Sequence, residues 1–399
     1  MVMAQLEHVV VVGGGLAAAR SCEQLREQGH AGRISLISAE AHLPYDRPPL
    51  SKDVLLGERD ATTLRVDYAE LRVDVRAGVR ATGLRPTDRV LVTDAGEIPY
   101  DGAILATGSD PIRMPGAGEQ LTLRTLDDAL TLRQRLEPGA RVVVIGASWI
   151  GAEVATAART RGCQVTCLEL DALPLARLMG DEVGKRLVSW WDGIDLRLGT
   201  AVATVETNGV RLADGTVLPA DVVVTGVGVR PATAWLEGSG LHLDRGVVTD
   251  EWLRAAPGVV AVGDVAVWWS RRYGRHLNLE HWDDAASAPS VAVAALLAPG
   301  LGDIEPHDPV PYFWSDQLGH KLQYVGRHTG TDQLIWRERE NGSWTALWLA
   351  PDSTLSAALI ADLPRENAQA QMAIMRGLVL DPALLADSAV PLTKAVRAD

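Results

Sequence analysis

Residues 9–18, VVVVGGGLAA, decide the fold of the first part of the chain. The four valines predict a fully buried parallel strand, which leads through the glycines into a predicted helix, Ala19–Gln28. In the pattern G-x-G-x-x-A, Gly13 permits a tight turn, Gly15 lets a pyrophosphate approach the backbone, and Ala18 lets helix and strand pack closely. The helix N-terminus then faces phosphate. The segment predicts a dinucleotide site, although the same pattern also occurs in turns that bind no ligand.

An acidic residue follows the next predicted strand. That strand is Arg33–Ser38, and Glu40 comes shortly after its end. A carboxylate at this place accepts hydrogen bonds from ribose hydroxyls. The strand, the helix and the acidic residue Glu40 together favour a dinucleotide site over a turn that binds no ligand.

The same arrangement returns about 130 residues later. Arg141–Ile145 is a predicted strand, and residues 146–151, GASWIG, form the turn. A predicted helix, Ala152–Arg161, follows, and a predicted strand, Cys163–Leu168, ends before Glu169. The chain therefore carries a second candidate dinucleotide fold.

Two positions in this second fold bear on its ligand. Ser148 replaces the middle glycine, so the backbone is approached less freely, but its small hydroxyl can itself contact phosphate. Glu169 would repel a 2′-phosphate and so favours NADH over NADPH. A structural duplicate that binds nothing is the alternative. Two dinucleotide folds in one chain narrow the chemistry, because one site holding FAD and another holding NAD(P)H is an economical arrangement for moving a hydride from nicotinamide to flavin.

Composition and charge narrow the classes of function. The 399 residues suggest two or three domains at roughly 150 residues each. An apolar share of 47% supplies several cores and excludes a mostly disordered chain. A net charge of -13 argues against nucleic acid or an anionic membrane surface as the main partner.

Neither a targeting segment nor a membrane span is predicted. The apolar run Val9–Val12 is too short for a signal segment. The stretch Ser290–Pro299 falls well below the roughly 20 residues that a span needs. We therefore expect a cytoplasmic protein without a membrane partner, and we predict no metal site.

Residues 44–52, PYDRPPLSK, are by themselves a proline-stiffened loop that ends in a cation. Together with the two glycine patterns, they resemble the flavin-contacting segment of the FAD-dependent NADH:ferredoxin reductases of bacterial cytochrome P450 and Rieske oxygenase systems. The resemblance runs almost end to end. Its other motifs are Ala106–Gly108, Arg124–Leu126, Gly258–Asp264, Glu280–Trp282 and Phe313–Gln317.

The resemblance implies an α/β fold of the glutathione reductase-like kind. Two Rossmann-like dinucleotide-binding domains would be followed by a C-terminal α/β domain with an antiparallel sheet. Residues 1–112 and 243–310 would form a discontinuous FAD domain, residues 113–242 the NADH domain, and residues 311–399 a domain covering the flavin. The predicted strands that suit the antiparallel sheet are Leu322–Gly326, Gln333–Arg337 and Trp344–Leu349.

The resemblance also implies cofactor contacts by position, with Asp264 at the FAD ribityl chain. The implied FAD contacts are Gly13, Gly15, Leu16, Ala17, Ala18, Glu40, Arg47, Lys52, Val79, Ala106, Thr107, Gly108, Arg124, Asp264, Trp282 and Trp314. The implied NADH contacts are Gly146, Ser148, Ile150, Gly151, Glu169, Arg177 and Gly228.

Three residues are implied in the chemistry. In the family, a lysine at the place of Lys52 pairs with a glutamate at the place of Glu153. A cation near flavin N5 would stabilise the anionic reduced flavin, whereas a clasp between domains is the alternative role of the pair. The resemblance places Trp282 and Trp314 at the isoalloxazine, and Trp314 on the electron route out. A lone Trp otherwise usually fills a core.

The cysteines argue against disulfide chemistry. Family relatives that reduce disulfides or peroxides carry a cysteine beside the flavin, whereas Ala41–Tyr45 holds none and the sequence has no C-x-x-C. On a predicted strand, Cys163 and Cys167 stand about 13 Å apart, beyond disulfide reach. We expect both to be apolar strand residues, and Cys22 to pack on the first helix. Thioredoxin reductase, glutathione reductase and NADH peroxidase activities are disfavoured.

A basic patch offers a candidate dock. Arg271, Arg272, Arg275 and His276 form the densest positive cluster of an acidic chain. One reading is a solvated turn, and the other is a dock for an acidic 2Fe-2S ferredoxin, which such a chain needs in order to steer the encounter.

The resulting prediction is an NADH-dependent ferredoxin reductase that contains FAD. It would pass single electrons to a 2Fe-2S ferredoxin, and thus to a cytochrome P450 or Rieske oxygenase. A rubredoxin reductase or an NADH oxidase of the same fold is the enzyme alternative, which rates with ferredoxin, rubredoxin and oxygen would separate. A redox or interaction flavoprotein of the apoptosis-inducing-factor kind is the other class. A monomer and a homodimer both remain open.

Overall fold

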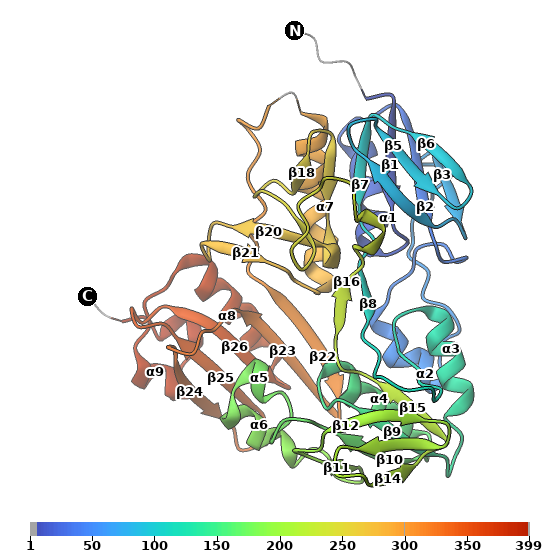
Figure 1. Ribbon diagram of the computed structural model, residues 1–399. Coiled ribbons are helices and arrows are strands. Elements are labelled where there is room, and N and C mark those ends of the chain that lie inside the picture. Colours follow the sequence, from blue (N-terminus) through green and yellow to red (C-terminus); the bar gives the residue numbers. More distant parts are fainter. Residues whose placement is uncertain (1–5, 299, 398–399) are drawn as a thin grey trace. The chain divides into compact units, whose positions relative to one another are not determined.

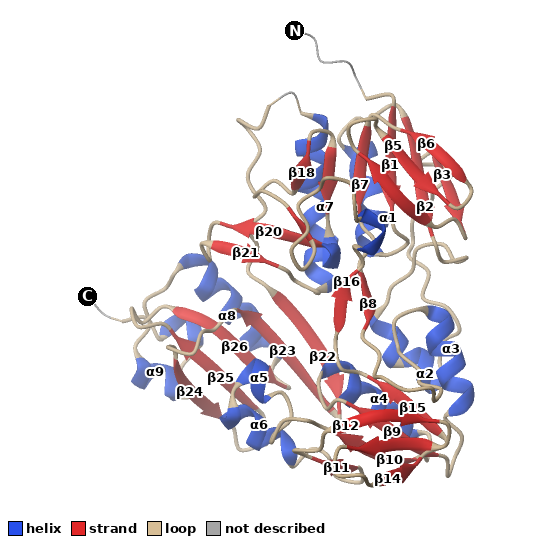
Figure 2. Cartoon of the chain, in the orientation of Figure 1, coloured by secondary structure: helices blue, strands red, loops and turns tan. Residues whose placement is uncertain are grey.

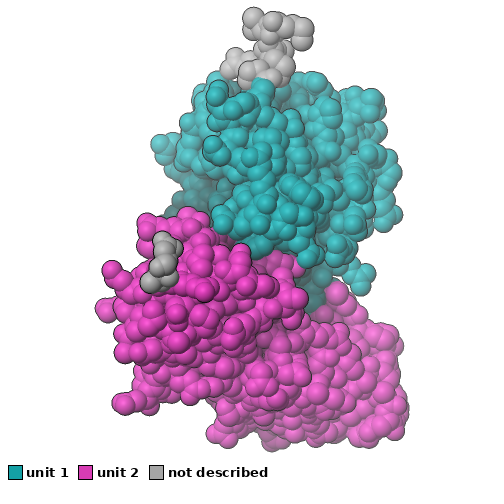
Figure 3. All heavy atoms as spheres, turned by 90° about the vertical axis from the view of Figure 1, so that its left-hand side faces the viewer, with its two compact units in different colours: residues 1–49, 61–111, 228–309 teal, residues 50–60, 112–227, 310–399 magenta. Residues whose placement is uncertain are grey.

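A computed structural model of the chain describes residues 6–298 and 300–397 (Figure 1). The chain divides into two compact units, coloured teal and magenta in Figure 3. The first unit comprises residues 1–49, 61–111 and 228–309, and the second comprises residues 50–60, 112–227 and 310–399.

The first unit is built on a six-stranded sheet with the order β18-β19-β7-β1-β2-β3. Its strands run parallel except for β18. Val9–Val12 lie in β1 at the centre and are at most 2% exposed, as a parallel strand with neighbours on both sides requires. Helices α1 and α7 lie side by side against the sheet (Figure 2), joined where the Gln28 amide donates to the Ser290 carbonyl at 2.9 Å.

Smaller sheets complete this unit. Strands β4, β5 and β6 form an antiparallel meander, β17, β20 and β21 form a second sheet, and β8 pairs with β16. The helices and strands of the unit are β1 His8–Val12, α1 Leu16–Glu27, β2 Arg33–Ser38, β3 Val73–Ala77, β4 Ala81–Arg85, β5 Val90–Thr93, β6 Gly96–Pro99, β7 Gly102–Leu105, β8 Ser109–Pro111, β16 Val229–Pro231, β17 Val247–Val248, β18 Arg254–Ala256, β19 Val259–Ala261, β20 Ala266–Ser270, β21 Arg275–Leu277 and α7 Trp282–Leu297.

The second unit holds a parallel sheet, β11-β10-β9-β15, and a five-stranded antiparallel sheet, β22-β23-β26-β25-β24. Helix α8 covers one face of the antiparallel sheet, and α5 and α6 pack on the other. The helices and strands of the unit are α2 Asp53–Leu56, α3 Leu126–Arg135, β9 Arg141–Ile145, α4 Trp149–Thr160, β10 Gln164–Leu168, α5 Ala176–Met179, α6 Asp181–Val188, β11 Asp195–Arg197, β12 Val202–Glu206, β13 Gly209–Leu212, β14 Val217–Pro219, β15 Val222–Thr225, β22 Tyr312–Gln317, β23 His320–Gly326, β24 Gln333–Glu338, β25 Trp344–Leu349, β26 Leu355–Ala361, α8 Pro364–Arg376 and α9 Pro382–Ala386.

The α/β class, both Rossmann-like folds and the C-terminal antiparallel sheet are confirmed. The helices after both glycine patterns begin earlier than predicted, at Leu16 and Trp149. Gly15 and Ser148 are the N-caps of these helices, so the helical backbone begins at the residue directly after each of them. Among the residues that the structure describes, no helix is both long and apolar enough to cross a membrane.

The division into units differs from the expected boundaries in two places. Residues 50–60 belong to the second unit, and residues 228–242 belong to the first. In addition, the second Rossmann fold and the C-terminal sheet share one apolar core, to which Met179, Val183 and Leu359 contribute. Three separate domains therefore stay a prediction.

Candidate functional site

The first glycine turn follows β1, the strand at which the strand order of the first unit's sheet reverses. Strand β1 has β2 on one side and β7 on the other, so the strand order reverses at β1, and the carboxyl ends of β1 and β7 are the place where an open α/β sheet binds a ligand. Gly13 has a φ of +140°, and a Cβ there would stand 2.0 Å from the Ala106 carbonyl oxygen. Only glycine can therefore make this turn.

Gly15 keeps space open in the same turn. The described heavy atom nearest to an added Cβ is Nε of Arg47, at 3.9 Å. The first turn of α1 consists of the apolar residues 16–19, so none of its own side chains is a carboxylate that would compete with a phosphate for the helix N–H groups. A turn with this room and this helix end fits the pyrophosphate of a dinucleotide.

Glu40 is held beside this turn by two neighbours. The Arg47 guanidinium donates to its carboxylate at 2.7 Å, and the Tyr45 hydroxyl donates to its other oxygen. Burial disfavours the charged form of Arg47, but Tyr45 and Glu40 outweigh it and raise the pKa of Arg47. Glu40 thus stays near the end of β2, and Val79 lies beside it through a backbone bond to Ser38 at 2.9 Å. This is the place where a ribose hydroxyl needs an acceptor.

The other motifs of the first unit are fixed by partners that the sequence did not indicate. The Ser109 hydroxyl donates to the Asp264 carboxylate at 2.8 Å, and the Asn278 amide donates to the Asp264 carbonyl at 2.9 Å. The Trp282 indole donates to the Asp46 carboxylate at 2.7 Å. Of the remaining predicted FAD contacts in this unit, the first three begin α1 and the last two follow β7: Leu16, Ala17, Ala18, Thr107 and Gly108.

The second glycine turn sits at the corresponding place in the second unit, between β9 and β15. Gly146 has a φ of +102°, and a Cβ there would stand 2.5 Å from the Gly226 carbonyl oxygen. A Cβ on Gly151 would stand 1.8 Å from the Gly146 carbonyl oxygen. Ser148 is the N-cap of α4, and Ile150 follows in its first turn, 43% exposed. This turn also fits a dinucleotide phosphate.

Glu169 lies at the edge of that turn. Its carboxylate accepts hydrogen bonds from the backbone N–H groups of Ala147 and Asp171, at 2.8 and 2.9 Å. Arg177 pairs with Asp171 at 2.7 Å and is largely exposed. Gly228, also predicted as an NADH contact, lies in the first unit, directly before β16, and its contact stays a prediction.

Lys52 and Glu153 form the predicted pair. The Lys52 ammonium lies 2.9 Å from the Glu153 carboxylate, which is 5% exposed. Ser51 donates to the same oxygen, whereas the Ser315 hydroxyl and the Asp316 N–H donate to the other, at 2.6 and 3.2 Å. The pairing of Lys52 was predicted, but Ser51, Ser315 and Asp316 were not.

Two arginines explain why the segment with Lys52 belongs to the second unit. Arg133 donates to the Arg59 carbonyl at 3.1 Å, and Arg161 donates to the Leu55 carbonyl at 3.3 Å. Cations at the C-terminal carbonyls of a helix are favourable. The two side chains thus tie α2 to α3 and α4 within one unit.

Arg124 and Trp314 also belong to the second unit. Arg124 precedes Thr125, which caps α3 in a capping box with Asp128. The Trp314 ring stacks on Tyr312, with ring centres 6.1 Å apart. The flavin contacts of Lys52, Arg124 and Trp314 stay predictions, as do the other cofactor contacts.

The predicted basic dock is partly neutralised. Arg271 makes two hydrogen bonds of 2.5 Å to Glu251, and this pairing lowers the pKa of Glu251. Arg272 is exposed at the turn between β20 and β21, and Arg275 and His276 are exposed at the start of β21. The positive charge offered to a partner is therefore that of Arg272 and Arg275 more than that of Arg271.

The expectation that Cys163 lies on a strand is wrong. Strand β10 begins one residue later, and the Cys163 thiol donates to the Glu137 carbonyl. Cys22 and Cys167 are buried as expected. Burial raises the pKa of Cys22 to about 12 and also raises the pKa of Cys167, so both remain thiols at neutral pH.

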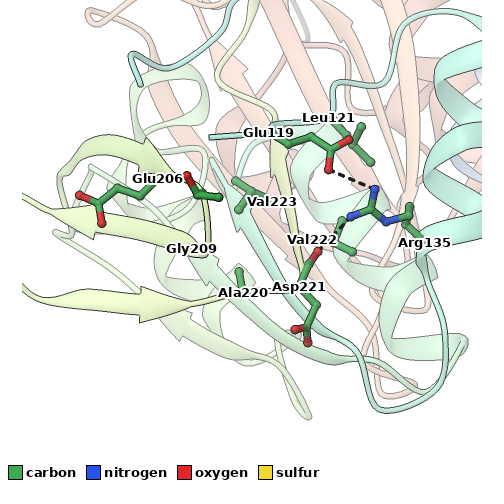
Figure 4. A pocket seen from close by; sticks show the side chains of 10 residues that line it. Glu119, Leu121, Arg135, Glu206, Gly209, Ala220, Asp221, Val222 and Val223 are labelled. Atoms are coloured by element: carbon green, nitrogen blue, oxygen red, sulfur yellow. Dashed lines mark hydrogen bonds and ion pairs between the residues drawn. The ribbon is translucent and has the colours of Figure 1, made fainter. Parts of the chain in front are cut away.

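A small polar pocket in the second unit lies away from the glycine turn (Figure 4). Arg135 pairs with Glu119 at 3.1 Å and donates to the Asp221 carbonyl at 3.3 Å at its wall. The pocket adjoins the start of β15, whereas nucleotides bind at the carboxyl ends of parallel strands. It is therefore not the nucleotide site.

Comparisons with known proteins agree with this geometry. The anthranilate 1,2-dioxygenase system ferredoxin–NAD(+) reductase component of Burkholderia cepacia is 35% identical over 96% of this chain and 98% of that protein. The crystal structure of Fdr9 is 52% identical over 98% of this chain and 100% of its own, with a TM-score of 0.94. In the covalent putidaredoxin reductase–putidaredoxin complex, a chain is 31% identical over 98% of both chains, with a TM-score of 0.91.

Family models cover most of the chain. Residues 312–396 match the reductase C-terminal family, which corresponds to the antiparallel sheet and α8. Residues 7–288 match the family of pyridine nucleotide-disulphide oxidoreductases and span both glycine turns. Because this match covers more than half of the chain and the relatives align nearly end to end, the chain belongs to the pyridine nucleotide-disulphide oxidoreductase family, and within it resembles the ferredoxin reductases of bacterial oxygenase systems.

Proposed function

We propose that this protein is a cytoplasmic NADH-dependent ferredoxin reductase with FAD as its bound cofactor. Its acceptor is a 2Fe-2S ferredoxin that feeds a cytochrome P450 or Rieske oxygenase. The observation that carries the proposal is the pair of glycine turns, each at the switch point of its own parallel sheet. A bound FAD would supply the hydride-accepting and single-electron chemistry that links a two-electron donor to a one-electron acceptor.

The chain's own residues bind and orient the two nucleotides. The turn at Gly13 and Gly15, with Glu40 at the ribose, holds FAD. The turn at Gly146 holds NADH, and the Glu169 carboxylate beside it repels the 2′-phosphate of NADPH. Holding both nucleotides in fixed places is the main contribution of the protein to a hydride transfer.

An anaerobic titration tests this function. The purified yellow protein should bleach with a stoichiometric amount of NADH and require a large excess of NADPH. The reduced protein is then mixed with a 2Fe-2S ferredoxin, rubredoxin or oxygen in separate experiments. Fastest oxidation by the ferredoxin supports the proposal. Fastest oxidation by rubredoxin or by oxygen would instead identify a rubredoxin reductase or an NADH oxidase.

We propose that Lys52 tunes the bound flavin, with Glu153 as its partner. Lys52→Ala is expected to make the flavin midpoint potential more negative, because the reduced anion loses a nearby cation. Flavin reduction by NADH should slow by about tenfold, less than the 10²-fold loss of an uncompensated oxyanion donor, since Glu153 already offsets part of the charge. Dye-equilibrated potentiometry and stopped-flow absorbance measure the two effects.

Lys185→Ala is the control for that variant. Lys185 is 61% exposed in the same unit and pairs with Glu182 at 2.6 Å, so its removal should change neither quantity. An unchanged potential and an unchanged rate in Lys52→Ala would show that the pair is only a clasp.

We propose that Arg272 and Arg275 dock the acidic ferredoxin. Changing both to Gln should raise the apparent KM for ferredoxin by about tenfold at low salt and leave reduction of a small neutral dye unaffected. Arg271→Gln is the matched control, because Glu251 already compensates its charge. Equal losses with ferredoxin and dye, or an equal effect of the control, would contradict the docking role.

A further inference from the structure

The Glu153 carboxylate is shared between two parts of the second unit. Its Oε2 accepts hydrogen bonds from Lys52 and Ser51, which directly precede α2. Its Oε1 accepts from the Ser315 hydroxyl at 2.6 Å and from the Asp316 N–H at 3.2 Å, both on β22. Each oxygen thus has its own set of donors, from segments far apart in the sequence.

This division matters because a buried carboxylate must be compensated. Glu153 is only 5% exposed, so donors replace most of the water that would otherwise solvate its charge. Hydrogen bonds to an ionised group are about twice as strong as neutral ones. The donors on β22 therefore compensate part of the negative charge of Glu153, which Lys52 and Ser51 would otherwise have to compensate alone.

Ser315 is the stronger of the two donors on β22, and its loss need not displace the strand. It is 1% exposed, and its bond to Glu153 is the shorter one. The residue directly after β22 provides a second tie to α4, because the Leu318 N–H donates to the Thr156 hydroxyl at 2.8 Å. Strand β22 is also paired along its length with β23. Replacing Ser315 with alanine can thus remove its hydrogen bond to Glu153 and leave the backbone of β22 in place.

We propose that Ser315 is a positioning residue for Glu153. It fixes the carboxylate and draws part of its charge away from Lys52, so that more of the lysine charge acts on the bound flavin. The proposal rests on the tuning role proposed above for Lys52. It adds a residue of the C-terminal sheet to the set that controls hydride transfer.

Ser315→Ala tests the proposal in the holoprotein. Lys52 then compensates more of the Glu153 charge, and the reduced anion is stabilised less. The flavin midpoint potential should become more negative, and flavin reduction by NADH should slow by about fivefold, in keeping with the loss of one of several charge-assisted hydrogen bonds. FAD content and thermal unfolding are measured on the same samples, so that a folding defect is recognised.

Thr156→Val is the matched control. It removes the acceptor of the Leu318 N–H and keeps the shape of the side chain, so it loosens the same junction between α4 and β22 without touching Glu153. Potential and rate should stay at the values of the unchanged protein. If both variants shift the potential equally, Ser315 acts through the junction and the positioning role is wrong.

A double-mutant cycle with Glu153→Gln supplies a second test. Because Ser315 acts through Glu153, adding Ser315→Ala to Glu153→Gln should produce no further shift in potential. Independent, additive shifts would overturn the proposal. If Lys52→Ala shifts the potential and Ser315→Ala does not, the Ser315 role is wrong and the Lys52 role stands. If Lys52→Ala causes no shift, both roles fail.

Discussion

Gly15→Ala should fold and yet lose FAD. Gly15 has a φ of -102° and a ψ of -170°, a backbone conformation that alanine adopts readily. The nearest described atom to the new Cβ would be 3.9 Å away, so the protein itself accommodates the methyl. The pyrophosphate does not, because it must approach this backbone to receive N–H donors. Losing two such charge-assisted bonds, each worth about 1.5–3 kcal/mol, weakens FAD binding by at least about 100-fold.

The ratio of flavin to protein after purification measures this effect, with circular dichroism to show that the fold is retained. Gly13→Ala is the contrasting variant and should not fold normally, because its Cβ would stand 2.0 Å from a carbonyl oxygen at a φ of +140°. Gly83→Ala is the neutral control, since its Cβ would meet Val92 at an ordinary 3.6 Å. A Gly15→Ala protein with a full complement of FAD would place the pyrophosphate elsewhere.

Arg337→Leu should unfold much of the C-terminal sheet. The Arg337 side chain is 1% exposed and donates to the carbonyls of Leu385 and Val390, at 2.5 and 2.6 Å. It also faces Glu366, 3.6 Å away, whose charge partly offsets the burial that lowers the pKa of Arg337. Breaking such a buried arrangement by removing one partner costs about 3 to 5 kcal/mol.

Urea unfolding, followed by tryptophan fluorescence, to which Trp336, Trp344 and Trp348 of this sheet contribute, measures the loss. Arg339→Leu is the control, because Arg339 meets the same Glu366 at 2.6 Å but is 37% exposed. Its loss should cost about 1 kcal/mol or less. If the two variants were equally destabilised, burial of Arg337 would not be the cause.

The glycine turns show what local sequence can predict. Both follow from a few neighbouring residues, and the structure gives each residue the steric reason that the pattern implied, such as the contact of Gly13 with Ala106. The strand Trp344–Leu349 was also predicted with its observed bounds. These features depend on residues close together in the chain, where periodicity and turn chemistry are informative.

The missed residues depend on distant partners. Ser315 lies 162 residues from Glu153, and Asp46 lies 236 residues from Trp282. The sequence around a serine or an aspartate does not indicate which distant carboxylate or indole will form a hydrogen bond with it. The grouping of residues 50–60 with the second unit has the same kind of cause, since Arg133 and Arg161 hold that segment from outside it.

The donors around Glu153 also determine which segments of this chain can be exchanged with those of its relatives in a chimaeric protein. Residues 50–60, helix α4 and strand β22 are encoded far apart, but their side chains meet at one carboxylate. A chimaera that exchanges residues 311–399 keeps Lys52 and Glu153 and replaces the segment that supplies the Ser315 hydrogen bond to Glu153. Chimaeric reductases should therefore inherit these three segments from one parent, and natural substitutions at Ser51, Glu153 and Ser315 should arise together.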